Sequence, residues 1–232
     1  MKTYQIHLIR NGRTDSSASG RYIGHTDVLL SPEGVAEIHR LKNEAVYPQA
    51  EAVFTSPLKR CTQTAHAIYP DREPIEMREL MEYDFGEYEG KTPEQLASDE
   101  GFALWLAGGP EAAPPFGESN AEFSARVCGC FAKIVEGMMK AQVPSAAIIT
   151  HGGVIMTLLS AFGIPELPMP EWRTPSACGY TVRITPSVWM RGQKVEVIAE
   201  IPAFPQEEVP APDLETQAFY VDLEELRTQE TE

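Results

Sequence analysis

The apolar positions of this chain repeat with two periods, one typical of strands and the other typical of helices. Residues 4–9 (YQIHLI) are β-prone and predict a buried strand that ends at Arg10. Residues 146–150 (AAIIT) are almost wholly apolar, which is typical of a strand in the middle of a sheet. Further strands are predicted at 52–54, 75–77, 179–184 and 194–201.

Helical periodicity separates these strands. Ser31 caps a predicted helix from Pro32 to about Tyr47. Its apolar face consists of Val35, Ile38 and Leu41. Ser119 caps a longer helix, whose apolar stripe is Phe123, Val127, Phe131, Ile134 and Met138. Further helices are predicted from Ser56 to about Tyr69, at 93–107 and at 154–162. Strands that alternate with helices imply an α/β chain, folded as a three-layer α/β/α sandwich with a largely parallel central sheet.

Composition restricts the class of protein. The chain has 232 residues, 43% hydrophobic and 23% charged, as expected of one globular domain. No apolar run approaches a membrane span, and Arg10 and Arg13 interrupt the stretch that an export signal needs. The net charge of −15 argues against binding nucleic acid or an anionic membrane. Four cysteines without C-x-x-C spacing favour a reduced cytoplasm, and no metal or cofactor is expected.

The negative charge is concentrated at the end of the chain. Residues 207–232 hold nine acidic residues against one basic residue, Arg227, a net charge of −8. A short docking helix is indicated by the spacing of Phe219, Leu223 and Leu226. We therefore expect one domain at 1–204 and a partly disordered acidic tail at 205–232, with a partner-binding tail as the alternative.

Polar residues cluster where predicted strands end. Arg10 and Asn11 follow the first strand, Arg60 lies early in the helix after the second, and His151 ends the strand at 146–150. Two glycines follow His151 and leave N–H groups open at a helix start. Parallel strands end at the same edge of a sheet, where ligands bind. Because arginine forks bind phosphate oxygens well, we expect a phosphate site there.

These residues lie in motifs that resemble the histidine phosphatase superfamily, also called the phosphoglycerate mutase-like family. The family's Arg-His-Gly triplet corresponds to Arg10-Asn11-Gly12 in LIRNGRT. Further matches are GHTDVLLSPEG, with Leu29 where proline is usual, TSPLKRCTQTA, LMEYDFGEYEG, PPFGES and ITHGG. The matches cover roughly residues 4–165 in the family's order.

The resemblance implies a role for each matching residue. In the family, the first histidine attacks phosphorus, and a carboxyl group protonates the leaving alcohol. The carboxyl corresponds to Glu82, whose pKa we expect the apolar loop around Phe85 and Tyr88 to raise. His151, the family's second histidine, completes the catalytic set. Phosphate or substrate binding is implied for Arg10, Arg60, Thr14, Ile23, Gly24 and Gly152.

Asn11 stands where the family has its nucleophilic histidine. A carboxamide nitrogen cannot attack phosphorus, so the chain departs from the family at this position. Three interpretations remain: a natural phosphate-ester binder without turnover, a substitution introduced into an active phosphatase, and slow hydrolysis by a water that Asn11 and Glu82 hold. His25 is the one remote candidate for a replacement nucleophile. A fourth interpretation is an interaction protein that works through its acidic tail.

The substrate class is partly indicated. The segment between Glu82 and His151 is short and Ser17 stands where mutases have Asn, so the chain resembles the shorter phosphatase branch that includes the alpha-ribazole phosphatase-like enzymes. A small phosphorylated metabolite is therefore the expected partner, whereas the oligomeric state is not predicted. Residues that could stack on a flat leaving group, or form core, are Phe102, Trp105 and Phe116.

Overall fold

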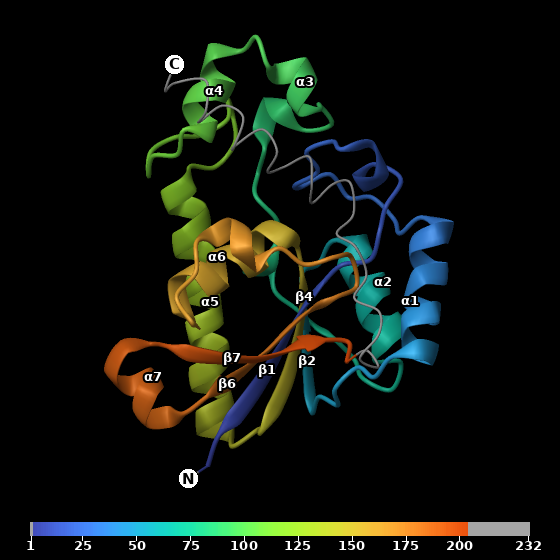
Figure 1. Ribbon diagram of the computed structural model, residues 1–232, viewed down its shortest axis with the longest axis vertical. Helices are drawn as coiled ribbons and strands as arrows, with labels where there is room; N and C mark the ends of the chain where they lie inside the picture. Colours follow the sequence, from blue (N-terminus) through green and yellow to red (C-terminus); the bar gives the residue numbers. More distant parts are fainter. Residues whose placement is uncertain (1, 204–232) are drawn as a thin grey trace.

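The structure is a computed structural model that describes residues 2–203, so the predicted tail lies outside the described residues. Its sheet has seven strands in the order β3-β2-β4-β1-β6-β7-β5 (Figure 1). The strands are β1 (Tyr4–Arg10), β2 (Ala52–Thr55), β3 (Ile75–Glu76), β4 (Ser145–Thr150), β5 (Gly163–Ile164), β6 (Gly179–Ile184) and β7 (Val195–Ile201).

The sheet is mixed, with a parallel half. Strands β3, β2, β4 and β1 are parallel to one another. Strand β6 is antiparallel to both β1 and β7, and β5 is parallel to β7. The prediction of a largely parallel sheet is therefore confirmed. The three strands that lead to predicted site residues, β1, β2 and β4, lie side by side in the parallel half.

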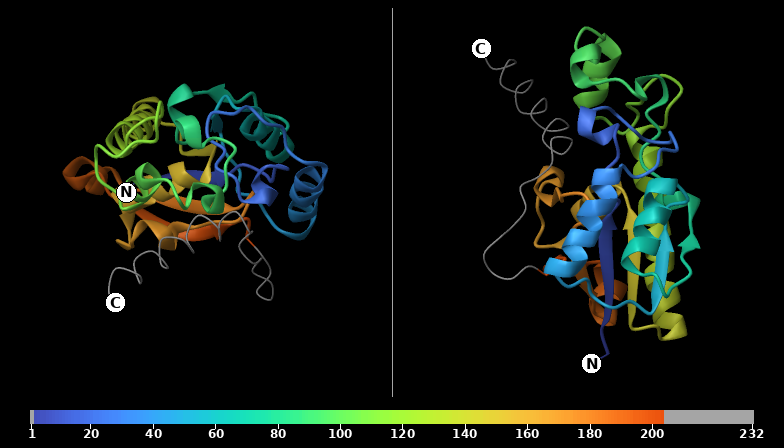
Figure 2. Two further views of the ribbon diagram at one scale, coloured as in Figure 1. Left: turned by 90° about the horizontal axis from the view of Figure 1, so that it is seen from above. Right: turned by 90° about the vertical axis from the view of Figure 1, so that its right-hand side faces the viewer.

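Helices cover both faces of the sheet (Figure 2). The helices of residues 2–203 are α1 (Pro32–Glu44), α2 (Lys59–Ile68), α3 (Pro93–Leu96), α4 (Glu100–Leu106), α5 (Asn120–Ala141), α6 (Gly152–Phe162) and α7 (Pro186–Gly192). Single 3-10 turns lie at Ser17–Ser19, Arg78–Leu80, Gly86–Tyr88 and Met169–Trp172. The three-layer α/β/α sandwich predicted from the sequence is confirmed.

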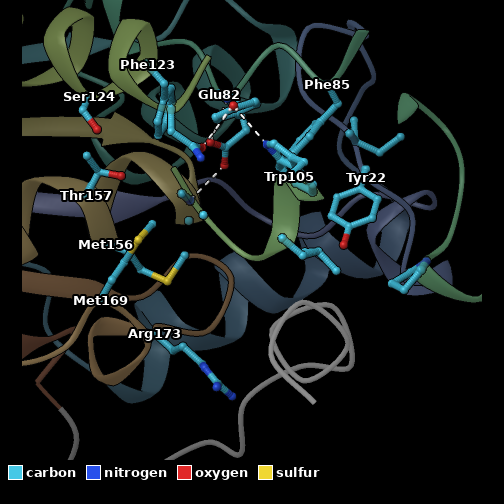
Figure 3. A pocket seen from close by; sticks show the side chains of 18 of the residues that line it. Tyr22, Glu82, Phe85, Trp105, Phe123, Ser124, Met156, Thr157, Met169 and Arg173 are labelled. Atoms are coloured by element: carbon cyan, nitrogen blue, oxygen red, sulfur yellow. Dashed lines mark hydrogen bonds between the residues drawn. The ribbon is translucent and has the colours of Figure 1, made fainter. Parts of the chain in front are cut away.

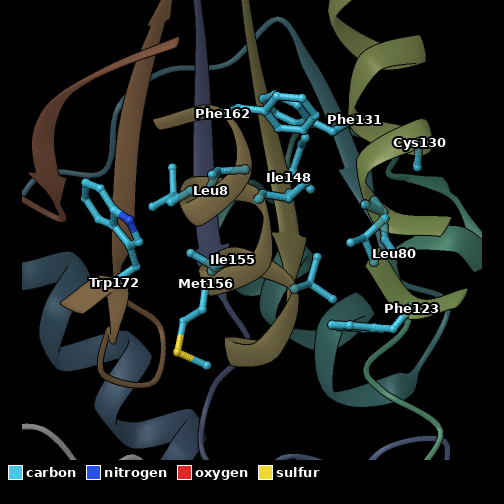
Figure 4. Close-up of a cluster of buried hydrophobic side chains, with 14 of the residues drawn as sticks. Leu8, Leu80, Phe123, Cys130, Phe131, Ile148, Ile155, Met156, Phe162 and Trp172 are labelled. Carbon is cyan, nitrogen blue, oxygen red and sulfur yellow. The ribbon is translucent and has the colours of Figure 1, made fainter. Parts of the chain in front are cut away.

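Two apolar clusters hold the layers together. Helices α1 and α2 pack on one face, where Ile9 and Ile149 point. Helices α5 and α6 pack on the other, against Leu8 and Ile148 (Figure 4). Neighbouring residues of β1 and β4 thus face opposite clusters, as the two-residue period of a strand requires. Burial on both faces explains why 146–150 is almost wholly apolar.

The boundaries of two predicted helices were wrong. Helix α1 ends at Glu44 rather than near Tyr47. Its predicted apolar residue Val35 is 39% exposed, and Gly34 is buried instead. A Cβ at Gly34 would lie 2.2 Å from the Arg13 carbonyl oxygen, so glycine lets this turn of the helix approach the loop after β1.

The predicted helix at 93–107 is two helices, α3 and α4. The Asp99 carboxylate accepts the Phe102 N–H and caps a new helix at Glu100, so one continuous helix does not form. The longer helix α5 matches its prediction closely. Ser119 and Glu122 form a reciprocal capping box at its start, and all five residues of the predicted stripe are buried.

The carboxyl ends of the parallel strands β1 and β4 lie at the same edge of the sheet. Helices α3 and α4 lie beyond the carboxyl ends of β1 and β4, at the end of the molecule opposite the N-terminus (Figures 1 and 2). They belong to the segment that connects Glu82 to α5. This segment therefore covers the edge at which Arg10 and His151 emerge from the sheet.

Candidate active site

Arg10 ends β1 and is 8% exposed. Its Nη1 donates a hydrogen bond of 2.9 Å to the Thr174 carbonyl oxygen. The guanidinium lies against the start of α6, because a Cβ at Gly152 would be 3.4 Å from Arg10 Nε. A helix N-terminus presents N–H groups and a positive dipole end. The Arg10 guanidinium and the N-terminal end of α6 therefore lie side by side.

Arg60, in the first turn of α2, is brought to the same edge. It is 3% exposed, and its Nη1 and Nη2 donate to the carbonyl oxygens of Thr26 and Gly24 at 2.8 and 2.7 Å. Its Nε donates to Nδ1 of His151 at 3.3 Å. The loop at 23–26 and the end of β4 thus fix the guanidinium from two sides.

His151 ends β4 and caps α6. Because Nδ1 accepts from Arg60, the network assigns the ring proton to Nε2, which donates to Ser56 Oγ at 2.9 Å. Burial lowers the His151 pKa well below its usual 6.5, and the charges of Arg60 and Arg10 lower it further. His151 is therefore a neutral hydrogen-bonding ring at neutral pH in this structure, not a cation.

Glu82 follows the turn at Arg78–Leu80 and lies across from His151 at the start of α6. Its carboxylate accepts the N–H groups of Gly153 at 2.9 Å and Tyr83 at 3.0 Å. Burial is the largest effect on the Glu82 pKa and raises it, although both N–H groups and both arginines oppose the shift. A carboxyl group with a raised pKa is suited to donate a proton near neutral pH.

Asn11 lies at the junction of β1 and β4, where its backbone N–H donates to the Thr150 carbonyl oxygen at 2.8 Å. Its side-chain Nδ2 donates to the adjacent Gly12 carbonyl oxygen, also at 2.8 Å. The side-chain amide of Asn11 therefore points toward the backbone of the next residue.

The remaining predicted site residues differ in what they contact. Thr14 is buried and exchanges hydrogen bonds with Ser17, which orders the loop after β1. Gly24 is buried where a Cβ would lie 1.9 Å from the Tyr83 carbonyl oxygen, so only glycine lets the two loops meet. The Ile23 carbonyl oxygen lies 3.5 Å from Arg60 Nη2.

His25 is exposed beside this site. Its Nε2 lies 3.1 Å from the Glu82 carbonyl oxygen, and its Nδ1 lies 3.4 Å from the Asp84 carboxylate. These contacts connect the loop at 23–26 with the loop that carries Glu82. Among residues 2–203 there is no cluster of His, Cys, Asp and Glu that could hold a metal ion.

A cavity of about 350 Å³ opens beside the charged groups (Figure 3). Of the predicted site residues, Arg10, Ile23, Glu82 and Gly152 line it. Trp105 lines it as well, whereas Phe102 is buried behind Trp105 at a ring distance of 5.9 Å. The expectation for Phe116 was wrong, because this side chain is 90% exposed and does not line the cavity.

Residues 6–191 match the profile of the histidine phosphatase superfamily (branch 1). The chain belongs to this superfamily. It is 27% identical over 185 residues to the adenosylcobalamin/alpha-ribazole phosphatase of Escherichia coli (strain K12), covering 78% of this chain and 90% of the relative. It is also 27% identical over 193 residues to a 2,3-bisphosphoglycerate-dependent phosphoglycerate mutase of Rhizobium etli, covering 76% and 89%.

Solved structures of histidine phosphatase relatives show the same fold. The alpha-ribazole phosphatase of Shigella flexneri superposes with a TM-score of 0.73 at 24% identity, over 88% of this chain and 100% of that chain. A phosphoglycerate mutase of Thermus thermophilus is 30% identical with a TM-score of 0.62, over 87% and 99%. Both phosphatases and mutases are thus among the relatives.

No helix within the described residues is long and apolar enough to span a membrane.

In this histidine phosphatase fold, two charged residues outside the predicted set organise the site. The Glu89 carboxylate accepts the N–H groups of Gly24 and His25 and the Thr26 hydroxyl. Arg126 on α5 donates to the Glu79, Met81 and Glu82 carbonyl oxygens and pairs with Glu118. Both are polar residues in loop-rich or amphipathic segments, and nothing in the sequence distinguishes them from surface charges.

Of the two residues expected to raise the Glu82 pKa, Phe85 and Tyr88, one lies beside Glu82 at the cavity. Phe85 lines the cavity beside Glu82, as expected, whereas Tyr88 packs against Phe102 and Trp105 and does not line it. Gly153 was expected to leave its N–H group open, but this N–H donates to the Glu82 carboxylate. It is the residue against which the Glu82 carboxylate rests, and the double glycine after His151 was the signal available in the sequence.

Proposed function

We propose that this chain binds phosphomonoesters at the carboxyl ends of β1 and β4. Arg10 and Arg60 offer donors to the phosphate oxygens beside the N-terminal end of α6, while His151 donates its ring proton to Ser56 Oγ and holds Arg60 through Nδ1. Arginine forks and helix N-termini are both suited to this anion. Thr14, Ile23, Gly24 and Gly152 form the surrounding backbone. The partner is a small phosphorylated metabolite.

The position of Glu82 carries the proposal of phosphatase chemistry. Two N–H groups hold its carboxyl at the wall of the cavity, which Arg10 also lines, and burial raises its pKa. A simple anion binder gains nothing from a carboxyl group at this point. During hydrolysis the ester P–O bond breaks and Glu82 gives its proton to the alcohol oxygen. The attacking water supplies the new oxygen on phosphorus and releases a proton that restores Glu82.

Asn11 limits the rate in this proposal. It occupies the position of the family's nucleophilic histidine, and its amide cannot form the covalent intermediate. Loss of a covalent nucleophile costs of order 10⁴–10⁶ in turnover, with the residual rate supplied by the remaining site. The chain is then a slow phosphatase in which water attacks directly. A binder without turnover is the second candidate, favoured by the Asn11 amide that donates to Gly12.

Hydrolysis is proposed over mutase chemistry. The connection from Glu82 to α5 holds one 3-10 turn and the short helices α3 and α4, in keeping with the shorter phosphatase branch. Relatives bear the names of both activities, so this choice rests on the chain itself. We place the protein in the cytoplasm because the spacing and number of its cysteines are not those of a disulfide scaffold.

The first experiment compares phosphomonoester hydrolysis by the unaltered chain and by Asn11→His between pH 5 and 8. Turnover that rises by several powers of ten in Asn11→His supports an intact site slowed by Asn11. Equal rates in both proteins contradict the assigned position of Asn11, and His25→Ala then tests the other histidine.

Binding is measured separately from turnover. Inorganic phosphate and vanadate should raise the melting temperature of the unaltered chain but not that of Arg60→Ala. If neither anion raises the melting temperature of the unaltered chain, the proposed phosphate site is wrong. The matched control is Arg40→Ala, since Arg40 lies on the outer surface of α1 and pairs with Glu44 one turn along the same helix.

A further inference from the structure

The cavity beside Glu82 is the place for the part of the substrate that leaves. We propose, resting on the function above, that this part is a flat, apolar alcohol such as an aryl or arylalkyl group, rather than a short carboxylate-bearing or sugar alcohol. The cavity's volume of about 350 Å³ lies within the range typical of small-molecule sites.

The cavity adjoins the reacting groups. Arg10, Glu82, Gly152 and Gly153 all line it, so a phosphate held by Arg10 and the start of α6 has Glu82 next to its ester oxygen. The alcohol attached to that oxygen must then extend into the cavity. The side chains that line the cavity therefore determine which alcohol binds well.

The walls are mainly carbon. Figure 3 shows Tyr22, Phe85 and Trp105 on one side and Met156 and Met169 on the other. Ring distances of 5.1 to 5.9 Å join the three aromatic side chains into one packed surface. Aromatic faces and thioethers bind flat apolar groups through dispersion and burial.

Hydrogen bonds within the wall use several of its polar atoms. Trp105 Nε1 donates to Tyr83 Oη at 3.1 Å, and Tyr83 Oη donates to Asn120 Oδ1 at 3.1 Å. Asn120 Nδ2 donates in turn to the Gly109 carbonyl oxygen at 3.0 Å. This chain of bonds occupies the polar edges of Trp105, Tyr83 and Asn120. A sugar with several hydroxyl groups would lose hydrogen bonds to water and find few replacements on the aromatic side of the cavity.

Few charged residues line the cavity. Among the described residues that line it, Glu82 is the one carboxylate, and the cations are Arg10, Arg21 and Arg173. Arg10 belongs to the phosphate end, and Arg21 donates to the Gly90 carbonyl oxygen in an exposed loop. A second anionic group on the alcohol, such as that of phosphoglycerate, would have to reach Arg21 or Arg173.

The test compares ligand affinities for the full chain by thermal shift and titration. The ligands are 1-naphthyl phosphate, glycerol 3-phosphate, 3-phosphoglycerate, a nucleoside 5′-phosphate and inorganic phosphate. We expect 1-naphthyl phosphate to bind roughly tenfold or more tightly than any of the others. Equal or tighter binding of glycerol phosphate, phosphoglycerate or the nucleotide, with inorganic phosphate still bound, overturns this inference and leaves the proposed function standing. No binding of any phosphate compound overturns the proposed function itself.

Helix α4 provides a matched pair of variants. Leu106 lines the cavity, whereas Leu104 on the same helix is 73% exposed and does not. Leu106→Gln should weaken 1-naphthyl phosphate roughly tenfold without changing inorganic phosphate, and Leu104→Gln should change neither. Met169→Gln, on the opposite wall, should act as Leu106→Gln does. Equal effects of Leu104→Gln and Leu106→Gln would contradict the inference, and the ligand series on the unaltered chain decides the matter if a variant does not fold.

Discussion

Gly153 and Glu82 are in contact with no room for a side chain between them. A Cβ at Gly153 would lie 2.4 Å from Glu82 Oε1, while the Gly153 N–H donates to Oε2 at 2.9 Å. Glycine at this position therefore sets how closely the carboxyl group approaches the start of α6. The orientation of the proposed acid depends on a residue that carries no functional group.

Gly153→Ala should displace Glu82 and reduce turnover more than it reduces phosphate binding. In an Asn11→His background, we expect kcat to fall by about tenfold or more, because a displaced acid no longer reaches the leaving oxygen. The cost in unfolding free energy should be about 1–3 kcal/mol, as for other overpacked sites. Steady-state kinetics and chemical denaturation measure both.

The control for this prediction is Gly137→Ala. Gly137 lies in α5, and a Cβ there would meet nothing within 4 Å. This variant should gain stability by about 0.5–1 kcal/mol, because alanine favours a helix more than glycine does. An unchanged kcat in Gly153→Ala would show that Glu82 does not act from the observed position.

The raised pKa of Glu82 predicts a particular pH dependence of stability. Because burial raises the folded-state pKa above 4.5, ionisation of Glu82 costs more in the folded than in the unfolded state. Its contribution to stability is present below that pH and is lost as the pH rises through the folded-state pKa. Glu82→Gln stays neutral, so its stability relative to the unaltered chain should rise with pH. The exposed Glu87→Gln serves as control, and a difference that does not grow with pH would contradict a raised pKa.

Two buried histidines predict loss of stability in acid. Burial lowers the pKa of His7 to about 4 and that of His151 well below 6.5. For a base with a lowered pKa, the folded state resists protonation, so stability is full above pH 6.5 and is lost as the pH falls below it. His7→Gln and His151→Gln should each flatten the melting temperature between about pH 6.5 and 4.5. His39→Gln, at an exposed position of α1, should leave that slope unchanged, and an equal effect of all three would refute the assignment.

Glu89 should act as a positioning residue for Arg60. It holds the loop at 24–26, whose carbonyl oxygens at Gly24 and Thr26 accept from the Arg60 guanidinium. Glu89→Ala should weaken phosphate binding several-fold, because the loop no longer fixes Arg60. Glu89→Gln, which keeps an acceptor oxygen, should restore part of the affinity. Isothermal titration with inorganic phosphate measures this, and unchanged binding in Glu89→Ala would show that α2 alone places Arg60.

Strand-end reasoning predicted the charged end of the site well. Arg10 and His151 follow adjacent parallel strands, and Arg60 follows the next strand out, so their meeting depended only on strand order and direction. Period and composition identify such strands because both faces are buried. The fold and the placement of these three residues were therefore accessible from the sequence.

The cavity was not accessible in the same way. Whether Trp105 and Phe116 face a ligand, the core or solvent depends on how α4 and its flanking loops pack, which local periodicity does not encode. Phe116 has a positive φ of 60° in a loop held by Gly86 and Gly117, and its side chain points outward. Glu89 and Arg126 were missed because their partners are backbone atoms of distant segments.

The two ends of the proposed ligand site come from different parts of the chain. Arg10 ends a central strand and His151 directly follows another, whereas Trp105 and Leu106 belong to α4, which lies outside the sheet. Exchange of the stretch between Tyr88 and Ser119 for that of a relative could thus alter ligand preference and leave the anion-binding half untouched. The architecture is modular, and new specificities can arise in it by replacing a surface insert while the sheet stays constant.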